Sequence, residues 1–371
     1  MIYLDHGATS FGKPPAVTEA MIRALQVCGN PGRGGHRAAM AAARVAYDCR
    51  ELAGQLFECR PEQVAFTGNC THGLNIAIRT LVDPGDTVVI SGFEHNAVTR
   101  PLYALGANVV IAGRKLFDPA DTLLSWEKAL RAAPKAAIFT HVSNVFGYRL
   151  PMEEMAALCR RYGVPFILDA AQSAGQLPVS LEKTGADFIA MPGHKGLLGP
   201  MGTGLLLCGR QPQPLLCGGT GSESRRQQMP GVLPDRLEAG TLNIPGIAGL
   251  AAGMRYVQSV GTETLLTRAV QQQKACAAGL KQLGFRVFSG AAQTGTVSFV
   301  PPMDCEEFAQ WLADRGIAVR AGLHCAPVAH ESAGTLETGT VRISFGHDAS
   351  NVQTNQLLAM ISTEKTKKFF E

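Results

Sequence analysis

The stretch FIAMPGHKGLLGPMGTGLLLC, residues 188–208, combines two apolar runs with a single lysine and five glycines. Each run has the length and residue types of a buried strand, so Lys195 stands just beyond the end of one strand and shortly before the next. Glycine has no Cβ, which lets the backbone beside the lysine come close to a ligand or to another chain. The stretch therefore predicts a lysine held at the edge of a sheet.

Short apolar runs like these recur along the first two thirds of the chain. They lie at residues 64–68, 87–91, 108–112, 136–143, 165–170, 187–191 and 203–208. Segments with a helical period separate most of them, and this alternation is typical of an α/β fold with a mainly parallel sheet and helices on both faces. The runs are apolar throughout, as strands covered on both faces should be. We therefore predict a seven-stranded, mainly parallel sheet.

The pattern changes near residue 210, which indicates a second domain. A long Ala-rich helix at 36–57 precedes the predicted sheet. A loop region rich in Gly, Pro and Ser follows the sheet, and further helices and short strands alternate from about residue 246 to the end. We predict a large α/β domain at 15–250, and a smaller α+β domain made of 1–14 and 251–371.

Composition and charge narrow the function classes. The chain has 371 residues, is 46% hydrophobic and 17% charged, and carries a net charge of +4, which indicates a folded protein rather than a disordered one. Only the last residues, TEKTKKFFE, are locally basic, which is typical of a solvated terminus and not of a nucleic-acid site. We expect no nucleic-acid partner.

The cysteines and the N-terminal residues indicate the compartment. Ten cysteines are scattered without a CxxC pair, which favours reduced, partly buried thiols over a zinc ribbon or a thioredoxin motif. No apolar stretch approaches the ~18–20 residues of a membrane span, and MIYLDHGATS lacks the pattern of a signal peptide. We expect a cytoplasmic protein with no membrane partner.

Polar side chains follow several of the predicted strands. They are His95 after 87–91, Asn144 after 136–143, Asp169 and Gln172 at the end of 165–170, and His194 and Lys195 after 187–191. Ligands of open α/β sheets bind just beyond the carboxyl ends of the strands. Any one of these residues also fits a structural role, such as an N-cap for the aspartate. Together they bring a carboxylate, amides, imidazoles and an amine to one edge.

This set of groups matches the requirements of pyridoxal phosphate. Lys195 supplies the amine for a Schiff base, and an ionised Asp169 would keep the pyridinium nitrogen protonated. Cys70 and Thr71 open a predicted helix, and the free N–H groups of its first turn suit a phosphate. A P-loop is excluded because no GxxxxGK[ST] occurs.

A second group of polar residues lies in IAVRAGLHCAPVAH, residues 317–330. Cys325 follows a predicted strand and stands five residues after Arg320, and a nearby cation raises the fraction of nucleophilic thiolate. Taken alone, this loop favours an inert buried thiol over a nucleophile. Arg342, in a later strand, is able to donate two parallel hydrogen bonds to a carboxylate. Taken alone, it is more simply interpreted as a partner in a surface ion pair.

Motifs throughout the chain resemble those of the class V aminotransferase family of fold-type I pyridoxal-phosphate enzymes. They are YLDHGAT, GNCTHGLN, FEHNAV, THVSNVFG, LDAAQSAG, GHKGLLGPMGTG, LEAGTLN, VRAGLHCAP and VRISF, in family order. The closest likeness is to the group II branch of cysteine desulfurases and selenocysteine lyases. The resemblance implies a homodimer whose active sites lie at the subunit interface.

The resemblance also implies a role for each site residue. Lys195 holds the cofactor and moves protons, Cys325 accepts sulfur, and His95 stacks on the ring and assists proton transfer. The other implied cofactor contacts are Asp169 at the ring nitrogen, Gln172 at the phenolate oxygen, Asn144 at the ring or substrate, Cys70, Thr71 and His194 at the phosphate, and Thr241 at the phosphate of the partner subunit. The implied substrate contacts are Arg342, Asn144 and Arg320, and no metal site is expected.

The chain departs from the family pattern at three places. Pro192 stands where the family usually has a serine, so one phosphate hydroxyl is missing. The family's common DNAAT reads DHGAT here, with His6 and Gly7. The TTE of its phosphate loop reads CTH, which puts Cys70 and His72 there. These departures bear on the substrate more than on the cofactor.

The activity that the resemblance implies is conversion of L-cysteine to L-alanine, with the sulfur passing to Cys325 as a persulfide and then to an acceptor, which the sequence does not identify. Three alternatives stay open at this point. One is a selenocysteine lyase. Another is a different class V reaction, transamination or epimerisation, in which Cys325 is incidental. The last is a non-catalytic scaffold for sulfur-transfer partners, against which the intact set of Lys195, Asp169 and His95 argues.

Overall fold

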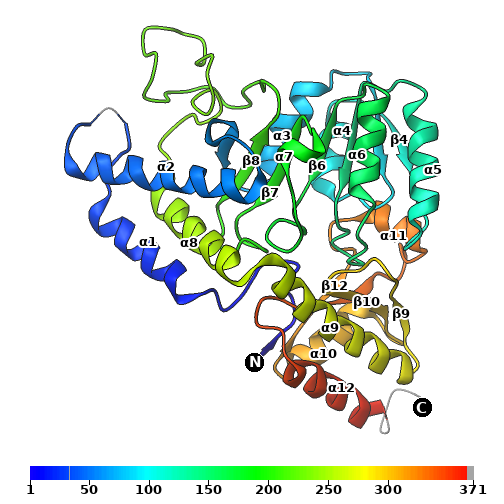
Figure 1. Cartoon of the computed structure of the whole chain (residues 1–371). Helices are drawn as coiled ribbons and strands as arrows, with labels where there is room; N and C mark the ends of the chain where they lie inside the picture. Colours follow the sequence, from blue (N-terminus) through cyan, green and yellow to red (C-terminus); the bar gives the residue numbers. More distant parts are fainter. Residues whose placement is uncertain (33, 366–371) are drawn as a thin grey trace.

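A computed structural model describes residues 1–32 and 34–365 of the chain. Figure 1 shows a large sheet flanked by helices and, below it, a smaller sheet with its own helices, beside which the N-terminus lies. Most of the basic tail discussed above, from residue 366 onward, lies outside the described residues. None of the helices in the described ranges combines the length and apolar composition that a membrane span needs.

The large sheet has seven strands, as predicted. They are β2 (Val64–Thr67), β3 (Thr87–Ser91), β4 (Asn108–Ala112), β5 (Ala136–Thr140), β6 (Phe166–Asp169), β7 (Phe188–Pro192) and β8 (Gly204–Cys208). Their order is β2-β8-β7-β6-β5-β3-β4. Only β8 runs antiparallel to its neighbours β2 and β7, and the remaining pairs are parallel. The prediction of a mainly parallel sheet is confirmed, and the carboxyl ends of β3, β5, β6 and β7 share one edge.

Helices cover both faces of this sheet. They are α1 (Pro15–Val27), α2 (Arg37–Phe57), η1 (Pro61–Gln63), α3 (Cys70–Leu81), α4 (Asn96–Ala104), α5 (Pro119–Leu130), α6 (Met152–Arg161), α7 (Leu181–Thr184) and α8 (Ile244–Val260). Side chains of α2, α5, α6 and α8 form one apolar cluster with the sheet, and those of α3 and α4 form a second cluster. Burial on both faces explains why the strands are apolar at every position.

The smaller sheet has the order β12-β13-β10-β9 and is antiparallel. Its strands are β9 (Arg286–Phe288), β10 (Thr296–Val300), β12 (Arg320–Gly322) and β13 (Thr340–Ser344), and its helices are α9 (Thr262–Gln282), α10 (Cys305–Ala313), α11 (Pro327–Ala333) and α12 (Asn351–Lys365). The N-terminal strand β1 (Ile2–Tyr3) pairs with β11 (Ile317–Ala318) beside this sheet.

A separate apolar cluster holds the small sheet together. Leu4 from the N-terminal segment joins Phe299, Ile343 and Leu357 in it. This cluster supports the proposed assignment of 1–14 to the small domain. The helix α8 spans the other proposed boundary, at residue 250, and continues to Val260.

Candidate active site

A cavity of about 230 Å³ lies at the edge where the parallel strands end. Residues that follow β3, β5, β6 and β7 line it together with the first turn of α3. The residues predicted from the sequence that line it are Lys195, Asp169, His95, Asn144, Gln172, His194, Cys70 and Thr71. The topology of the sheet thus brings together groups that are up to 125 residues apart (70 to 195) in the chain.

Lys195 stands in the turn after β7, and the glycines around it allow backbone to pack directly on backbone. A Cβ on Gly196 would lie 2.3 Å from the carbonyl oxygen of Ala174, and one on Gly193 would lie 2.1 Å from Thr203 Oγ1. Real Cβ contacts are never this short, so no side chain fits at either position. The glycines fix the turn from which the lysine projects.

Burial changes the acid–base behaviour of Lys195 and Asp169. Burial lowers the pKa of the Lys195 ammonium, and the nearby Asp169 carboxylate only partly opposes this. Burial likewise raises the pKa of Asp169. Two effects oppose burial: the backbone N–H of Ala171, which donates to Oδ1 at 2.8 Å, and the charge of Lys195. An amine that loses its proton readily and a carboxylate in need of a cationic partner therefore share one cavity.

Cys70 faces this carboxylate. Its thiol lies 3.5 Å from Oδ1 of Asp169 and donates to it, and the pKa of the thiol is raised well above its ordinary value, by burial first and by Asp169 second. The side chain is therefore protonated and directed to Asp169. What Cys70 offers to a phosphate is its backbone N–H.

The first turn of α3 and the residue before Lys195 form the part of the cavity suited to an anion. Asn69 caps the helix by accepting from the backbone N–H of His72, and the N–H groups of Cys70 and Thr71 have no acceptor within the described residues. Such free N–H groups attract a phosphate. His194 contacts Thr9 Oγ1 at 3.0 Å through Nδ1, and burial lowers the pKa of its ring to about 4.

His95 is held as a neutral imidazole. It caps α4, and its Nδ1 accepts from the backbone N–H of Ala97 at 2.9 Å, which leaves the ring proton on Nε2. Burial, with a smaller contribution from the charge of Lys195, lowers the pKa of His95 to about 4. The ring is therefore uncharged near neutral pH and presents an N–H donor.

Glu94 is a site residue that the sequence analysis missed. Its carboxyl accepts from the backbone N–H of Thr140 at 2.8 Å and from the hydroxyl of Ser91, so it joins the ends of β3 and β5. Burial raises the pKa of Glu94 to about 8. Its position directly before a strand-end histidine is the only signal in the sequence, and that signal does not reveal burial.

Gln172 and Asn144 tie the cavity to other parts of the chain. The amide of Gln172 donates to the carbonyl oxygen of Gly7 at 2.9 Å, and the amide of Asn144 donates to that of His324 at 2.7 Å. The first bond holds the N-terminal segment against the cavity. The second holds the loop that carries Cys325.

The Cys325 loop connects β12 to α11 and sits at the surface. Cys325 is exposed, and both it and His324 adopt left-handed backbone conformations, with φ of 55° and 49°. The carbonyl oxygen of Cys325 accepts from the backbone N–H of Asn96 at 2.7 Å. The loop is therefore docked beside His95 and Asn144, with the thiol outward.

Arg342 and Arg320, the predicted substrate contacts, do not line the cavity and both pair with Asp5. Arg342 Nη2 lies 2.8 Å from Oδ1 of Asp5, and Arg320 Nη2 lies 2.8 Å from Oδ2. The Arg342–Asp5 pair is buried, with side chains 3% and 8% exposed. A second guanidinium nitrogen of Arg342 donates to the carbonyl oxygen of Asn144 at 3.0 Å, while Nε has no partner within the described residues. The sequence analysis did not identify Asp5 as part of this group.

Thr241, predicted to act at the phosphate of a partner subunit, lines a different cavity in its own chain. That cavity, of about 480 Å³, is bordered by Arg50, Asp235 and Glu238. Thr241 therefore does not join Lys195 within one chain. Its predicted role stays a prediction.

Comparison with known proteins places this chain in a family. The model of the family described as aminotransferase class-V matches residues 2–357. A probable cysteine desulfurase of Pyrococcus abyssi is 32% identical, covering 93% of this chain and 89% of its own, and one of Methanothermobacter thermautotrophicus is 31% identical, covering 93% and 90%. The solved apo structure of a cysteine desulfurase from Thermococcus onnurineus has a TM-score of 0.89 at 31% identity, covering 99% of this chain and 95% of that one.

Proposed function

Because this chain belongs to the class-V aminotransferase family, we propose that it is a pyridoxal-phosphate-dependent cysteine desulfurase. It converts L-cysteine to L-alanine and takes the sulfur on Cys325 as a persulfide. The observation that carries the proposal is the meeting of half-buried Lys195 and buried Asp169 in one cavity whose wall includes free helix N–H groups.

The residues of the cavity fit the cofactor. Asp169 is a buried carboxylate without an ion-pair partner at contact distance in the described residues, and a pyridinium nitrogen would supply that partner. The N–H groups of Cys70 and Thr71 would hold the phosphate. When bound, pyridoxal phosphate supplies an electron sink for the pair left at the substrate Cα.

Lys195 is the proposed attachment point and proton carrier. Its lowered pKa favours the neutral amine, which takes the Cα proton of the substrate and later returns a proton to carbon. His95 presents Nε2–H to the cavity as a neutral donor. Arg342, whose Nε is unpaired, is the proposed contact for the substrate carboxylate, with Arg320 beside it.

Cys325 is the proposed sulfur acceptor. Its thiolate attacks the sulfur of the substrate, an S–S bond forms, the C–S bond breaks, and the carbon takes the proton that the substrate thiol gives up. The products are alanine and a persulfide on Cys325, so no outside oxidant or reductant is required. The exposure of Cys325 leaves the persulfide open to an acceptor.

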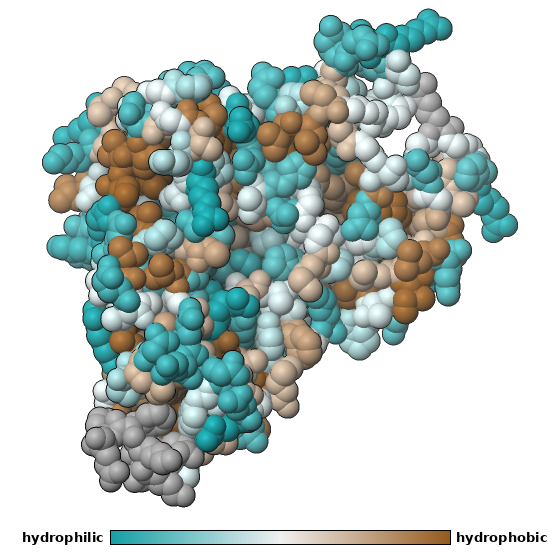
Figure 2. Space-filling model, turned by 180° about the vertical axis from the view of Figure 1, so that it is seen from behind, coloured by the Kyte–Doolittle hydropathy of each residue, from teal (hydrophilic) through white to brown (hydrophobic). Residues whose placement is uncertain are grey.

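Several large apolar side chains support the proposed homodimer. Figure 2 shows apolar groups among polar ones on the side of the molecule where α1 and α2 lie. The exposed apolar residues of these two helices are Ile22, Leu25, Val27, Met40 and Tyr47. Large apolar side chains exposed on neighbouring helices are typical of subunit interfaces. All ten cysteines are free, which supports the proposed cytoplasmic location.

Replacing Cys325 tests the proposal. Cys325→Ala should abolish release of sulfide and alanine from L-cysteine, while leaving the visible absorbance of the bound cofactor unchanged. The matched control is Cys217→Ala, which removes the other exposed thiol of the chain and should keep full activity. The persulfide should appear by mass spectrometry on the peptide that contains Cys325.

Full sulfide release by Cys325→Ala would remove the thiol from the mechanism. Pyruvate or an epimer without sulfide would indicate another class V reaction. Selenide release from selenocysteine that survives in Cys325→Ala, with cysteine activity low even in the unsubstituted enzyme, would indicate a selenocysteine lyase.

A further inference from the structure

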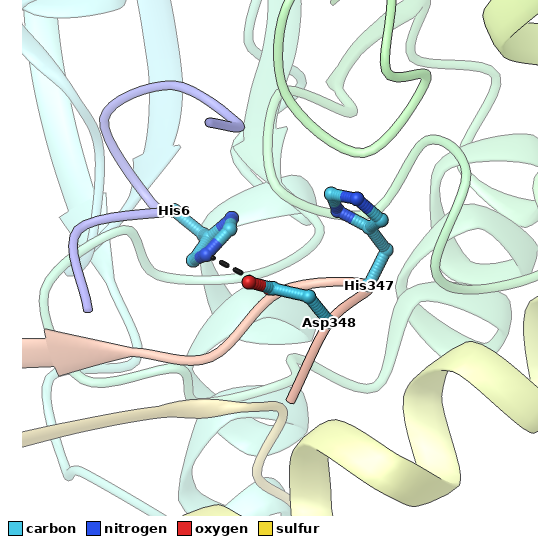
Figure 3. Close-up of side chains that lie close together, drawn as sticks. All are labelled: His6, His347 and Asp348. Carbon is cyan, nitrogen blue, oxygen red and sulfur yellow. Dashed lines mark ion pairs between the residues drawn. The ribbon is translucent and has the colours of Figure 1, made fainter. Parts of the chain in front are cut away.

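Three potential metal ligands meet where the N-terminal segment crosses the loop after β13. Figure 3 shows His6 from the first segment pointing toward Asp348, with His347 beside them. One ligand atom of each residue lies within 4.8 Å of the others, and His6 Nε2 is 3.1 Å from Asp348 Oδ1. None of the three lines the cavity of the candidate active site. His6 is one of the places where the chain departs from the family motif.

The hydrogen bonding of His347 fixes the form of its ring. Its Nε2 lies 3.0 Å from the carbonyl oxygen of Gly12, which only accepts, so Nε2 carries the proton. Nδ1 therefore keeps a lone pair, and this buried atom has no hydrogen-bond partner within the described residues. An imidazole with one nitrogen donating to a backbone carbonyl and the other free is the form in which histidine binds metals.

His6 is also buried. Its side chain is 5% exposed, Nδ1 has no hydrogen-bond partner within the described residues, and Nε2 has only the ion-pair contact with Asp348. Gly346 makes room for the ring, since a Cβ there would lie 2.2 Å from Nδ1. Leaving a buried polar atom unpaired is costly, which indicates that a bound group belongs here.

Asp348 completes the set with an anionic oxygen. The side chain is 46% exposed, which gives an ion a path from solvent. A cavity of about 20 Å³, enough for one water-sized species, adjoins His6 and His347.

We propose that His6, His347 and Asp348 bind one divalent transition-metal ion, with Zn²⁺ as the best-suited ion. Two imidazoles and a carboxylate are ligands that Zn²⁺ prefers, at roughly 2.0–2.2 Å. Ligand atoms around a tetrahedral ion are then roughly 3.3 Å apart, close to the His6–Asp348 distance, so His347 has only to turn inward. The fourth position faces solvent on the side of Asp348.

The metal would link the N-terminal segment to the loop after β13. His6 directly follows Asp5, which pairs with Arg342 and Arg320, and Gly7 accepts from Gln172 of the cavity. Fixing His6 to the loop after β13 therefore fixes the segment that holds these groups. The site is structural, and it stands whether or not the proposed desulfurase activity does.

Zinc binding to the cofactor-loaded enzyme tests the site. The protein is stripped with a chelator, dialysed and titrated with ZnCl₂ by calorimetry, and its metal content is measured by mass spectrometry. The unsubstituted chain should bind one Zn²⁺ per chain. His6→Asn, His347→Gln and Asp348→Asn should each weaken binding by about tenfold or more, since loss of a mere outer contact already costs ~10–100-fold.

Two further variants separate the ligands from the fold. His36→Asn removes an imidazole elsewhere but keeps the helix cap that His36 provides, and should bind Zn²⁺ normally. Gly346→Ala keeps all three ligands but displaces the His6 ring, and should weaken binding. Circular dichroism checks that each variant is folded. Zn²⁺ should also raise the thermal unfolding midpoint of the unsubstituted chain but not of His6→Asn.

The titration is repeated with Cys217→Ser and Cys325→Ser to remove the two exposed thiols, and one Zn²⁺ per chain should still bind. If the unsubstituted chain binds no Zn²⁺, or if the ion is lost with these cysteines, the proposal is wrong. Equal binding by His6→Asn and His36→Asn would also overturn it, and the three side chains would then form only an ion pair and its neighbour.

Discussion

Lys195 stands on a turn whose backbone packs against other backbone. Cys325, in contrast, stands on a surface loop that two hydrogen bonds tie to Asn96 and Asn144. Lys195 is half-buried as a residue, and the removal of its amine from water lowers the pKa of that amine. Cys325 is exposed, in a loop with two successive left-handed residues. A group that exchanges protons needs a fixed, dry position, while a group that hands sulfur to another molecule needs access. The difference shows that the fold separates these two demands between the sheet edge and the small domain.

Removing the amine gives the largest expected effect. Lys195→Ala should lower the rate of alanine formation by at least about 10³-fold, because both the attachment point and the proton carrier are lost. Borohydride reduction should no longer fix the cofactor to the chain, as seen by mass spectrometry. Lys183→Ala, at an exposed pair with Glu58, is the control. Cys325→Ala, in contrast, should still be labelled, and identical behaviour of the two variants would abolish the distinction between the regions.

Breaking the ion pair between Asp5 and Arg342 should lower the free energy of unfolding, and should leave the borohydride labelling of Lys195 unchanged. Asp5→Ala leaves the buried guanidinium of Arg342 without its anion, and should lower the free energy of unfolding by about 3–5 kcal/mol. Urea denaturation measures this. Asp48→Ala removes the half-buried partner of the exposed Arg44 and should cost no more than about 0.5 kcal/mol. Similar losses for both variants would contradict the burial argument.

The buried histidine rings should make the stability of the fold depend on pH. The pKa values of His95 and His194 are about 4 and that of His141 is about 3, against an ordinary value of 6.5, in each case because burial disfavours the charged ring. At these three rings the unfolded chain therefore binds more protons than the folded chain between about pH 6.5 and 4, so their contribution to the free energy of unfolding should fall as the pH drops through this range. Each ring contributes about 1–3 kcal/mol.

His141→Gln tests one contribution to this slope, because its ring is fully buried at the end of β5. Urea midpoints measured from pH 7 to 4 should fall less steeply in the variant. The matched control is His36→Gln at the exposed start of α2, which should leave the slope unchanged. An unchanged slope in His141→Gln would show that burial of this ring does not govern acid stability.

The strands of the large sheet were predictable because a strand that is buried on both faces consists of a short run of apolar residues. All seven lie within three residues of the predicted bounds, and β3 and β4 match them fully. The convergence of Lys195, Asp169 and His95 followed from the same reasoning, since parallel strands end at a common edge. Their chemical roles stay predictions.

Features that depend on contacts between distant segments were not predictable in this way. Asp5 and Arg342 are 337 residues apart, and nothing in the local pattern around Asp5 announces an ion pair. The meeting of His6 with His347 and Asp348 has the same origin, because it depends on β1 pairing with β11 and on the path of the loop after β13. Hydrophobic periodicity reports which face a residue occupies, but not which side chain it meets.

The crowding around Gly193 and Gly196 has one more consequence. Because the backbone on both sides of Lys195 is closely packed, the Cα of Lys195 stays in place during a turnover. Every excursion of its amine must come from rotation about the bonds of its own aliphatic stem. The length of that stem therefore sets the radius within which protons are picked up and delivered.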